Sequence, residues 1–233
     1  MTLHDVIESV EDRAKRLTLY VGPGGEAFVD SVREFFDSQN VTVDHRPADG
    51  GPERAVLRED GEDLVTVEFA ALETLVDPDV RPPDVGADVS YRRLLAHLDD
   101  TTFTSYDRRQ MLYTSREVED RAWRLRDGEL HAGFQELAIF ETQRDVYRRL
   151  GQSGLDVHVY GVPDGVTDEE TNVTVHPRTE ADFGRTWFVV FDGGGDDAQK
   201  SALLAEERSS DHYYGFWTYD ADVVDRIIAV LDA

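Results

Sequence analysis

The spacing of apolar residues alternates between helical and strand patterns through the first 76 residues. Leu3, Ile7, Val10 and Ala14 recur at helical spacing, which predicts an opening amphipathic helix. Residues 17–21 form a short, mostly apolar run that predicts a strand. The elements predicted after it are a helix over residues 27–40, a strand over 41–45, strands over 55–57 and 64–67, and a helix over 70–76.

Turn residues separate these elements. A glycine-rich turn over residues 22–25 follows the first strand, and the dipeptide Asp60-Gly61 joins the last two strands. Both central residues of an Asp-Gly turn tolerate positive φ, so these strands are predicted to pair as a hairpin. Residues 77–86 contain three prolines and show no hydrophobic periodicity, which predicts a linker and a domain boundary.

This linker divides the chain into an expected unit over residues 1–84 and a second over residues 85–233. The elements predicted in the second unit are helices over residues 91–98, 108–126, 144–150 and 223–231, and strands over 101–104, 136–140, 156–162, 173–175, 187–191, 202–207 and 215–219. Residues 187–191 are apolar at every position, which is typical of a central strand covered on both faces. We therefore predict an α/β protein with a mixed β-sheet layered with helices, in which a small N-terminal α/β unit precedes a larger α/β domain.

Charge restricts the classes of partner. The chain carries 49 Asp and Glu against 24 Lys and Arg, a net charge of -25, whereas an ordinary small domain has a magnitude of roughly 2–8. Such a surface repels phosphate backbones and anionic headgroups, so neither nucleic acid nor a membrane is expected as a partner. Because molar salt screens self-repulsion, the composition indicates a protein of a salt-accumulating halophile.

The absence of cysteine excludes disulfides, thiolate chemistry and zinc sites built on sulfur. The sequence also has no run of about 18 apolar residues, and its N-terminus lacks the apolar core of a signal peptide. We therefore expect a cytoplasmic protein.

A glycine pattern near the N-terminus suggests one alternative function. Gly22-x-Gly24-x-x-Ala27 lies between a predicted strand and helix, and Asp44 follows on the next strand, which formally matches a dinucleotide-binding fingerprint. Backbone amides and the helix N-terminus would bind a pyrophosphate. However, Pro23 removes one amide, and a hairpin replaces the next βαβ unit. A plain turn is favoured, and an enzyme or binding protein for nucleotides or phosphorylated metabolites remains the alternative.

The longest predicted helix carries the first candidate site residues. Its apolar stripe, with spacings of 4, 3, 4 and 3 residues, consists of Met111, Ser115, Val118, Ala122 and Leu125. Glu119 lies one turn from Ser115 and Trp123, at the edge of this stripe. A partly buried carboxylate beside a hydroxyl and an indole is a candidate ligand contact, because the protein must supply it with donors. A structural network with Arg116, Arg121 or a backbone amide would explain the pattern equally well.

Aromatic and histidine side chains on the later strands form pairs, because alternate residues of a strand share a face. The pairs on one face are His158 with Tyr160, Trp187 with Phe191 and Tyr214 with Phe216, while Trp217 and Tyr219 point the other way from the last pair. Such side chains can line an aromatic pocket with polar groups or simply fill a core. The core interpretation is favoured.

Catalytic and metal-binding patterns are missing from the sequence. The seven histidines show no H-x-x-x-H spacing, and no G-x-S-x-G element occurs. The acidic stretch over residues 192–197 lacks the alternating ligands of a calcium loop. We therefore expect no catalytic residue, no metal and no cofactor.

Six stretches of the chain, in this order, resemble the DICT sensory domain. They are MLYTSREVEDRAWR (111–124), GELHAGFQEL (128–137), VYRRLGQSGLDVHVYGVPD (146–164), WFVVFDGGGD (187–196), ALLAEER (202–208) and YGFWTYD (214–220). The family is named for its occurrence with diguanylate cyclases and two-component systems. Halophilic archaea carry many versions, so the resemblance implies a haloarchaeal member. The resemblance covers about residues 90–233.

The resemblance implies a signal-input module, without established catalytic activity, in second-messenger, two-component or light-response pathways. The positions that match the family are Ser115, Glu119, Phe134-Gln135, Tyr160-Gly161-Pro163 and Phe216-Trp217-Thr218. We combine them with the residue reasoning into one expected ligand site, formed by Ser115, Glu119, Phe134, Gln135, His158, Tyr160 and Trp217.

Together these observations predict a stand-alone, non-enzymatic sensory protein that binds an unknown small ligand or partner segment. No kinase, cyclase or receiver follows the last predicted helix, so signalling is expected through a separate kinase, cyclase or regulator, or through self-assembly as a homodimer. The remaining alternative is a structural adaptor without a ligand, in which all the aromatic strands are core.

Overall fold

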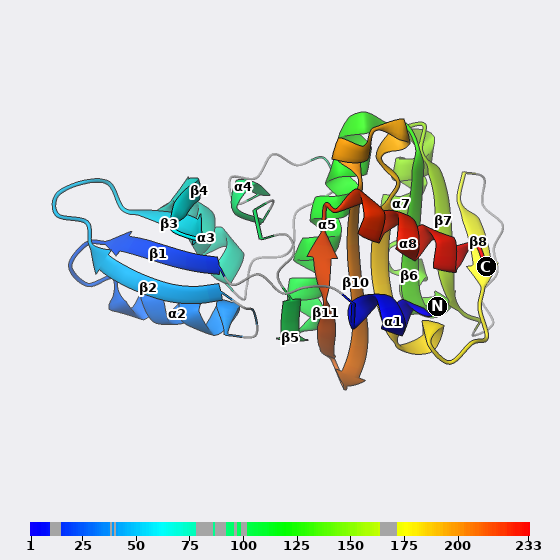
Figure 1. The fold of residues 1–233 in the computed structure, drawn as a ribbon, viewed down its shortest axis with the longest axis horizontal. Helices are drawn as coiled ribbons and strands as arrows, with labels where there is room; N and C mark the ends of the chain where they lie inside the picture. Colours follow the sequence, from blue (N-terminus) through cyan, green and yellow to red (C-terminus); the bar gives the residue numbers. More distant parts are fainter. Residues whose placement is uncertain are drawn as a thin grey trace.

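The computed structural model describes residues 1–9, 15–37, 39, 41–77, 86, 92–95, 97–98, 102–163 and 172–233. Within these residues the chain forms two β-sheets with helices, and the sheets lie toward opposite ends of the long axis (Figure 1). The fold is α/β with mixed sheets, as the sequence predicts. The division into units over residues 1–84 and 85–233 stays a prediction, because most of the proposed linker lies outside the described residues.

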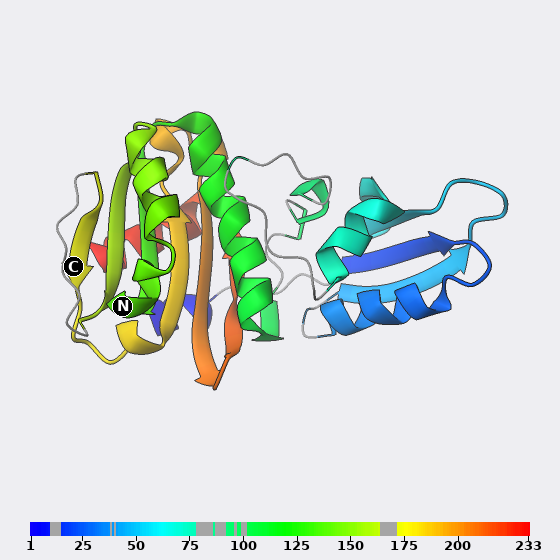
Figure 2. The ribbon, with the colours of Figure 1, turned by 180° about the vertical axis from the view of Figure 1, so that it is seen from behind.

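The smaller sheet has four strands in the order β2-β1-β3-β4. Its strands are β1 (Lys15–Val21), β2 (Val41–Pro47), β3 (Arg54–Glu59) and β4 (Glu62–Glu68). Helix α2 (Glu26–Phe36) connects the parallel strands β1 and β2, and α3 (Phe69–Val76) packs against α2 on the same face of the sheet (Figure 2). Asp60 and Gly61 have φ values of 49° and 89° between the antiparallel strands β3 and β4, which confirms the predicted hairpin turn.

The larger sheet has seven strands in the order β5-β11-β10-β9-β6-β7-β8. Its strands are β5 (Thr102–Tyr106), β6 (Glu129–Glu136), β7 (Asp156–Val162), β8 (Thr174–Pro177), β9 (Thr186–Phe191), β10 (Ser201–Ser209) and β11 (His212–Thr218). The pairs β6-β7 and β7-β8 are parallel, and the others are antiparallel. Every residue of the central strand β9 is buried, as its continuous apolar pattern predicts.

Helices cover both faces of the larger sheet. Three of them lie on one face, namely α5 (Arg108–Leu125), α6 (Leu137–Glu141) and α7 (Arg144–Gln152) (Figure 2). The opposite face carries α8 (Ala221–Leu231) and α1 (Leu3–Ile7) (Figure 1). We call these the α5 face and the α8 face. Alternation along β9 assigns Trp187 to the core of the α5 face and Phe188 to that of the α8 face.

Short elements complete the chain. Helix α4 (Arg92–Leu95) contacts both β4 of the smaller sheet and α5 of the larger one. Three 3₁₀ turns cover Phe183–Arg185, Gly193–Gly195 and Asp197–Gln199. Helix α5 starts at a capping box, in which the Asp107 side chain accepts from the Gln110 amide and the Gln110 side chain accepts from the Asp107 amide.

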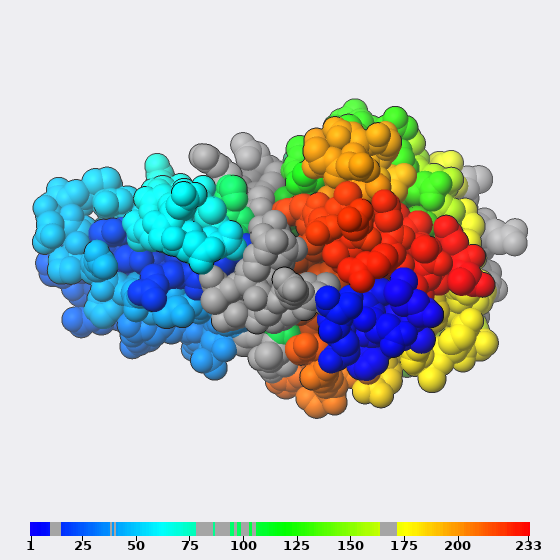
Figure 3. Space-filling model, viewed as in Figure 1, coloured from blue at the N-terminus to red at the C-terminus, as the bar shows by residue number. Residues whose placement is uncertain are grey.

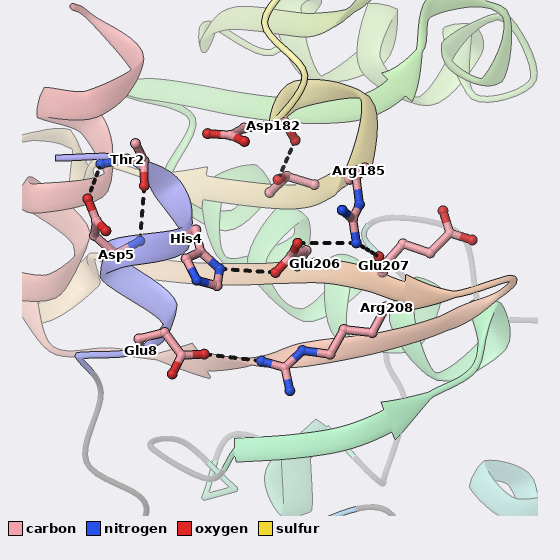
Figure 4. A network of polar contacts seen from close by, with 10 residues as sticks. Thr2, His4, Asp5, Glu8, Asp182, Arg185, Glu206, Glu207 and Arg208 are labelled. Atoms are coloured by element: carbon pink, nitrogen blue, oxygen red, sulfur yellow. Dashed lines mark hydrogen bonds and ion pairs between the residues drawn. The ribbon is translucent and has the colours of Figure 1, made fainter.

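The first helix belongs spatially to the larger sheet. Leu3, Val6 and Ile7 are buried against α8 and β10, and Figure 3 shows this segment packed beside α8. Polar contacts surround the apolar ones: His4 Nδ1 lies 3.1 Å from Glu206 Oε2, and Arg208 donates to Glu8 over 3.1 Å (Figure 4). The N-terminal segment therefore packs on the larger sheet although the smaller sheet follows it in sequence.

One predicted strand is wrong. Residues 136–140 do not form a strand, because β6 ends at Glu136 and Leu137–Glu141 is helix α6. A β-bulge ends the ladder, with a register shift between Gly133 and Glu136 and a φ of 60° at Gln135. The apolar run that follows is short enough to be either a strand or a helix of one to two turns. Periodicity alone does not distinguish a strand from a helix in so short a run.

Other differences concern element ends. The opening helix stops at Ile7, and residues 10–14 of its predicted span lie outside the described residues. Helix α2 ends at Phe36, before the predicted end near residue 40. Leu125, predicted to close the buried stripe of α5, is 39% exposed because it is the last helical residue, next to Arg126 in the left-handed conformation.

Candidate functional site

The seven predicted site residues occupy two faces of the larger sheet. Those on the α5 face are Ser115, Glu119, Phe134, Gln135 and Trp217, whereas His158 and Tyr160 lie on the α8 face. The sheet separates the two groups, so the structure does not bring all seven residues around one cavity. The prediction that His158 and Tyr160 share a face is confirmed, and they stack with His131 and His176.

Glu119 is the centre of a buried polar cluster between α5 and α7. Its side chain is 1% exposed, so it lies inside the apolar stripe and not at the edge where the sequence predicts it. Tyr147 donates its hydroxyl to Oε1 over 2.5 Å, and Arg116 pairs with Oε2. Arg116 also donates to Gln143 Oε1 over 2.5 Å. Both carboxylate oxygens therefore have charge-assisted partners, as a buried carboxylate requires.

Burial and the neighbouring Glu119 carboxylate raise the pKa of Tyr147 well above its ordinary value. Tyr147 therefore stays protonated and acts as the donor to Glu119. Of the two arginines that the sequence suggests as partners, Arg116 makes the contact. Arg121 instead donates to the carbonyl oxygens of Ala198 and Gln199.

Ser115 links α5 to the central strand. Its hydroxyl accepts a 3.0 Å hydrogen bond from Trp187 Nε1 and donates to the Met111 carbonyl over 2.9 Å. Ser115, Glu119 and Phe134 line a cavity of about 10 Å³, which is room for about one water molecule. This part of the predicted site is therefore closed and filled by the protein's own side chains.

The bulge in β6 turns Gln135 toward the neighbouring strands. Its Oε1 accepts from the Tyr213 hydroxyl over 3.2 Å, and its Nε2 donates to Glu207 over 2.7 Å. The ring of Tyr213 stands edge-on to that of Trp187, with 5.6 Å between centroids. A positive φ at a residue other than glycine is uncommon and needs such support from its surroundings.

Trp217 lines a second cavity of about 10 Å³ on the α5 face, next to α4. Leu95 of α4 closes one side, and Thr114 and Glu117 of α5 line another. Its indole Nε1 is buried and has no hydrogen-bond partner within the part of the chain that the structure describes. Trp217 and Ser115 therefore border different cavities.

Histidines and Tyr160 form a stack on the α8 face. His131 Nδ1 lies 3.0 Å from the Tyr160 hydroxyl, and His158 Nδ1 lies 3.0 Å from His176 Nε2. Burial, reinforced by the neighbouring His158, lowers the pKa of His131 to about 4, and burial raises the pKa of Tyr160 to about 12. At neutral pH His131 and Tyr160 are therefore both uncharged.

The glycine-rich turn lines an open cleft of about 610 Å³ at the carboxyl ends of the parallel strands β1 and β2. Two of its amides are engaged within the protein: Gly25 donates to the Gly22 carbonyl, and Gly22 donates to Glu53 over 2.7 Å. Glu26 and Asp49 also line the cleft. A carboxylate already binds one amide that a phosphate would use, and further carboxylates repel phosphate, which disfavours the nucleotide alternative.

Among the residues that the structure describes, no group of three or more histidine or acidic side chains is arranged to hold a metal ion. No helix among those same residues is long and apolar enough to cross a membrane.

Sequence reasoning missed several partners in these networks. They are Gln143, Tyr147, Glu207, Tyr213, His131 and His176. Only the Arg116–Glu119 pair carries a local signal, because residues three apart on a helix are neighbours. The others come from separate elements, and no pattern within one element indicates them.

Comparisons with known proteins support one assignment. No curated protein matches the sequence. One similar solved structure is a polyphosphate kinase from Porphyromonas gingivalis, with 13% identity and a TM-score of 0.39 over 99% of this chain. The chain spans 47% of that protein, and a similarity of this size establishes neither a shared fold nor a shared activity.

The family comparison is more specific. The model of DICT, described as a sensory domain in diguanylate cyclases and two-component systems, matches residues 88–208. This match covers α5, the β6-α7-β7 unit and most of the larger sheet. Five of the six recognised motifs lie within it, and the sixth, over residues 214–220, lies beyond its end. With more than half of its residues matched, the chain belongs to the DICT sensory domain family, whose role is signal input.

Proposed function

We propose that this protein is a signal-input module that binds a small molecule or a partner segment on the α5 face and signals through a separate kinase, cyclase or regulator. The observation that carries the proposal is the buried Glu119 cluster, which ties α5 to α7 within the family-matched residues. The functional residues in this proposal are the members of the predicted site that lie on the α5 face. His158 and Tyr160 lie on the other face and have a separate role.

Buried polar networks suit such a role for a physical reason. A buried ion pair is stable only in a narrow geometry, because misplacing either partner leaves a charge without compensation. Tyr147 and Gln143 hold Glu119 and Arg116 from α7 or from just before it, so a shift of α5 against α7 changes all of these contacts together. A ligand that favours one of two packing arrangements of α5 would shift their populations, and a partner protein would detect the difference.

The experiment is purification of the full chain from native cells in molar KCl, followed by native mass spectrometry. A bound small molecule or a stable partner protein is expected to be recovered. The identified ligand or partner then raises the melting temperature of the parent protein, and Glu119→Gln reduces that rise. Glu206→Gln, which alters an ion pair with His4 on the other face, is the matched control and keeps the full rise.

Equal rises in Glu119→Gln and Glu206→Gln would contradict the assignment to the α5 face. Recovery of a stable heterocomplex with no small molecule, together with an unchanged affinity in Glu119→Gln, would favour the structural adaptor instead.

A further inference from the structure

The cavity beside α4 lies at a junction between the two sheets. Leu95 of α4 forms one wall, and Val118 of α5 and Trp217 of β11 form others. The same helix α4 also contacts β4 at the edge of the smaller sheet. A ligand in this cavity would therefore touch the element that connects the two sheets.

One residue that lines this cavity has a buried polar group without a hydrogen-bond partner among the described residues. It is Trp217, whose Nε1 is unpaired and whose side chain is 5% exposed. Buried polar groups are paired in most proteins, so an unpaired one beside a cavity indicates an unfilled binding site.

Trp187 provides the internal comparison. It lies on the same face of the same sheet, and its Nε1 donates to Ser115 over 3.0 Å. The α5 face can thus supply an indole with a protein acceptor, and it does so at one of its two buried tryptophans on the strands. At Trp217 the acceptor has to come from outside the described protein atoms.

We propose that the cavity beside α4 is the input site, and that it takes a compact, uncharged ligand with a hydrogen-bond acceptor on an apolar body, such as a heteroaromatic ring. This inference rests on the proposed function, because it names the ligand class for the same face. The acceptor takes the indole N–H of Trp217, and Leu95 and Val118 contact the apolar body.

The charges around the cavity favour an uncharged ligand. Glu117 lines the cavity and would repel an anion, and Arg124 already lies 4.0 Å from its carboxylate. The other walls are mainly apolar, and an ion there would lose its hydration without compensation.

Entry of such a ligand requires α4 to move. The cavity measures about 10 Å³, which accommodates one water molecule and no ring. The side chain of Leu95 must therefore be displaced, and with it the contact between α4 and β4. Ligand binding in the cavity is therefore coupled to the packing of α4 against β4, the edge strand of the smaller sheet.

The test compares pyridine with benzene, which have the same shape and differ in the acceptor nitrogen. The full chain is titrated in molar KCl at alkaline pH, where pyridine is uncharged, and the indole N–H signals are followed by ¹⁵N NMR. We expect a saturable shift of the Trp217 signal and about fivefold tighter binding of pyridine, the size that one hydrogen bond supplies. The Trp187 signal is expected to stay in place.

Variants separate the site from its surroundings. Trp217→Phe is expected to bind the two probes equally, whereas the matched control Trp187→Phe keeps the preference for pyridine. Leu95→Ala enlarges the cavity and is expected to bind both probes more tightly with the preference retained. In the parent protein, pyridine is also expected to slow solvent exchange of the Trp217 N–H and to alter amide exchange in β4 but not in β8.

Equal binding of the two probes by the parent protein would overturn the inference, as would a preference that survives in Trp217→Phe. Absence of any saturable shift in both the parent and Leu95→Ala would overturn it as well. If Trp217→Phe does not fold, the exchange rates of the Trp217 and Trp187 N–H groups in the parent decide the question. A native ligand whose binding depends on Glu119 but not on Trp217 would leave the proposed function standing and remove this site.

Discussion

The two faces of the larger sheet hold their polar groups in different ways. On the α5 face, the ion pair between Glu119 and Arg116 is buried, and each member has a further hydrogen bond, to Tyr147 and to Gln143 respectively. On the α8 face, the helix α1 is fastened by ion pairs such as Glu8–Arg208, in which both side chains are about half exposed. The first arrangement depends on short-range geometry, and the second depends on charges that solvent can screen.

This difference matters in a chain with a net charge of -25. In molar salt the Debye length falls to about 3 Å, so exposed charges interact only at contact. Buried pairs are screened much less, because salt ions cannot approach them. We therefore expect the specific functions of this protein to depend on its buried polar groups, with its acidic surface serving mainly solubility.

The largest expected effect is on the buried Glu119 cluster. Glu119→Ala leaves Arg116 without its charge partner in a buried position, and we expect a loss of about 3–5 kcal/mol in the free energy of unfolding. Urea unfolding in molar KCl measures it. The matched control Glu206→Ala, on the other face, is expected to cost about 0–1 kcal/mol. Similar losses in both variants would remove the distinction between the faces.

A second effect concerns His131, a buried polar residue of the histidine stack on the α8 face. The folded pKa of His131 is lowered to about 4 against 6.5 for the free side chain, so the unfolded chain binds the proton more readily. Above about pH 6.5, His131 is neutral in both the folded and the unfolded chain and does not lower the free energy of unfolding. As pH falls from there toward 4, the unfolded chain binds the proton first, and the free energy of unfolding decreases. At about 1.4 kcal/mol per pKa unit, the loss reaches about 3 kcal/mol.

The measurement is the difference in pH dependence between the parent protein and His131→Asn. This subtraction removes the titration of the carboxylates that both proteins share, including Glu129, which lies 3.4 Å from His131 Nε2. The stacked neighbours His158 and His176 are also common to both proteins. Urea midpoints between pH 7 and about pH 4.5 are expected to fall more steeply for the parent. Parallel curves would show that His131 is not held neutral by the fold.

The smallest effect is expected at the docking of α1. Glu8→Gln removes the exposed pair with Arg208, and we expect a loss of about 0–1 kcal/mol at moderate salt that disappears in molar KCl. Urea unfolding at the two salt concentrations measures this. A loss that persists in molar KCl would show that α1 is held by geometry as specific as that of the α5 face, and the comparison would fail.

The fold could be predicted from the sequence wherever one local pattern had one physical solution. Residues 187–191 are apolar throughout and form the central strand, and Asp60-Gly61 forms the hairpin turn. The apolar run over residues 137–140 was compatible with a strand or a helix. It forms a helix, which follows the bulge at Gln135. Gly133 contributes to this local geometry, since a Cβ there would come within 2.2 Å of the Phe188 ring.

The candidate site could be predicted only in part, for a related reason. The apolar stripe of α5 indicates that Ser115 and Glu119 are buried, and the i, i+3 spacing indicates Arg116 as a partner. Tyr147 reaches Glu119 from 28 residues away, and Trp187 reaches Ser115 from 72 residues away, so no local spacing identifies them. His158 and Tyr160 share a strand face, but which side of the sheet they occupy depends on the strand order.

The sequence by itself determined the types of most elements, the excess of acidic residues, the absence of cysteine chemistry and membership of the DICT family. These properties follow from composition, from the periods of helix and strand, and from ordered motifs. The tertiary structure decided that Glu119 has its donors, that Trp217 lacks an acceptor among the described residues, and that the seven predicted residues lie on two faces. Contacts between distant elements depend on the order of strands in the sheet, which no local period encodes.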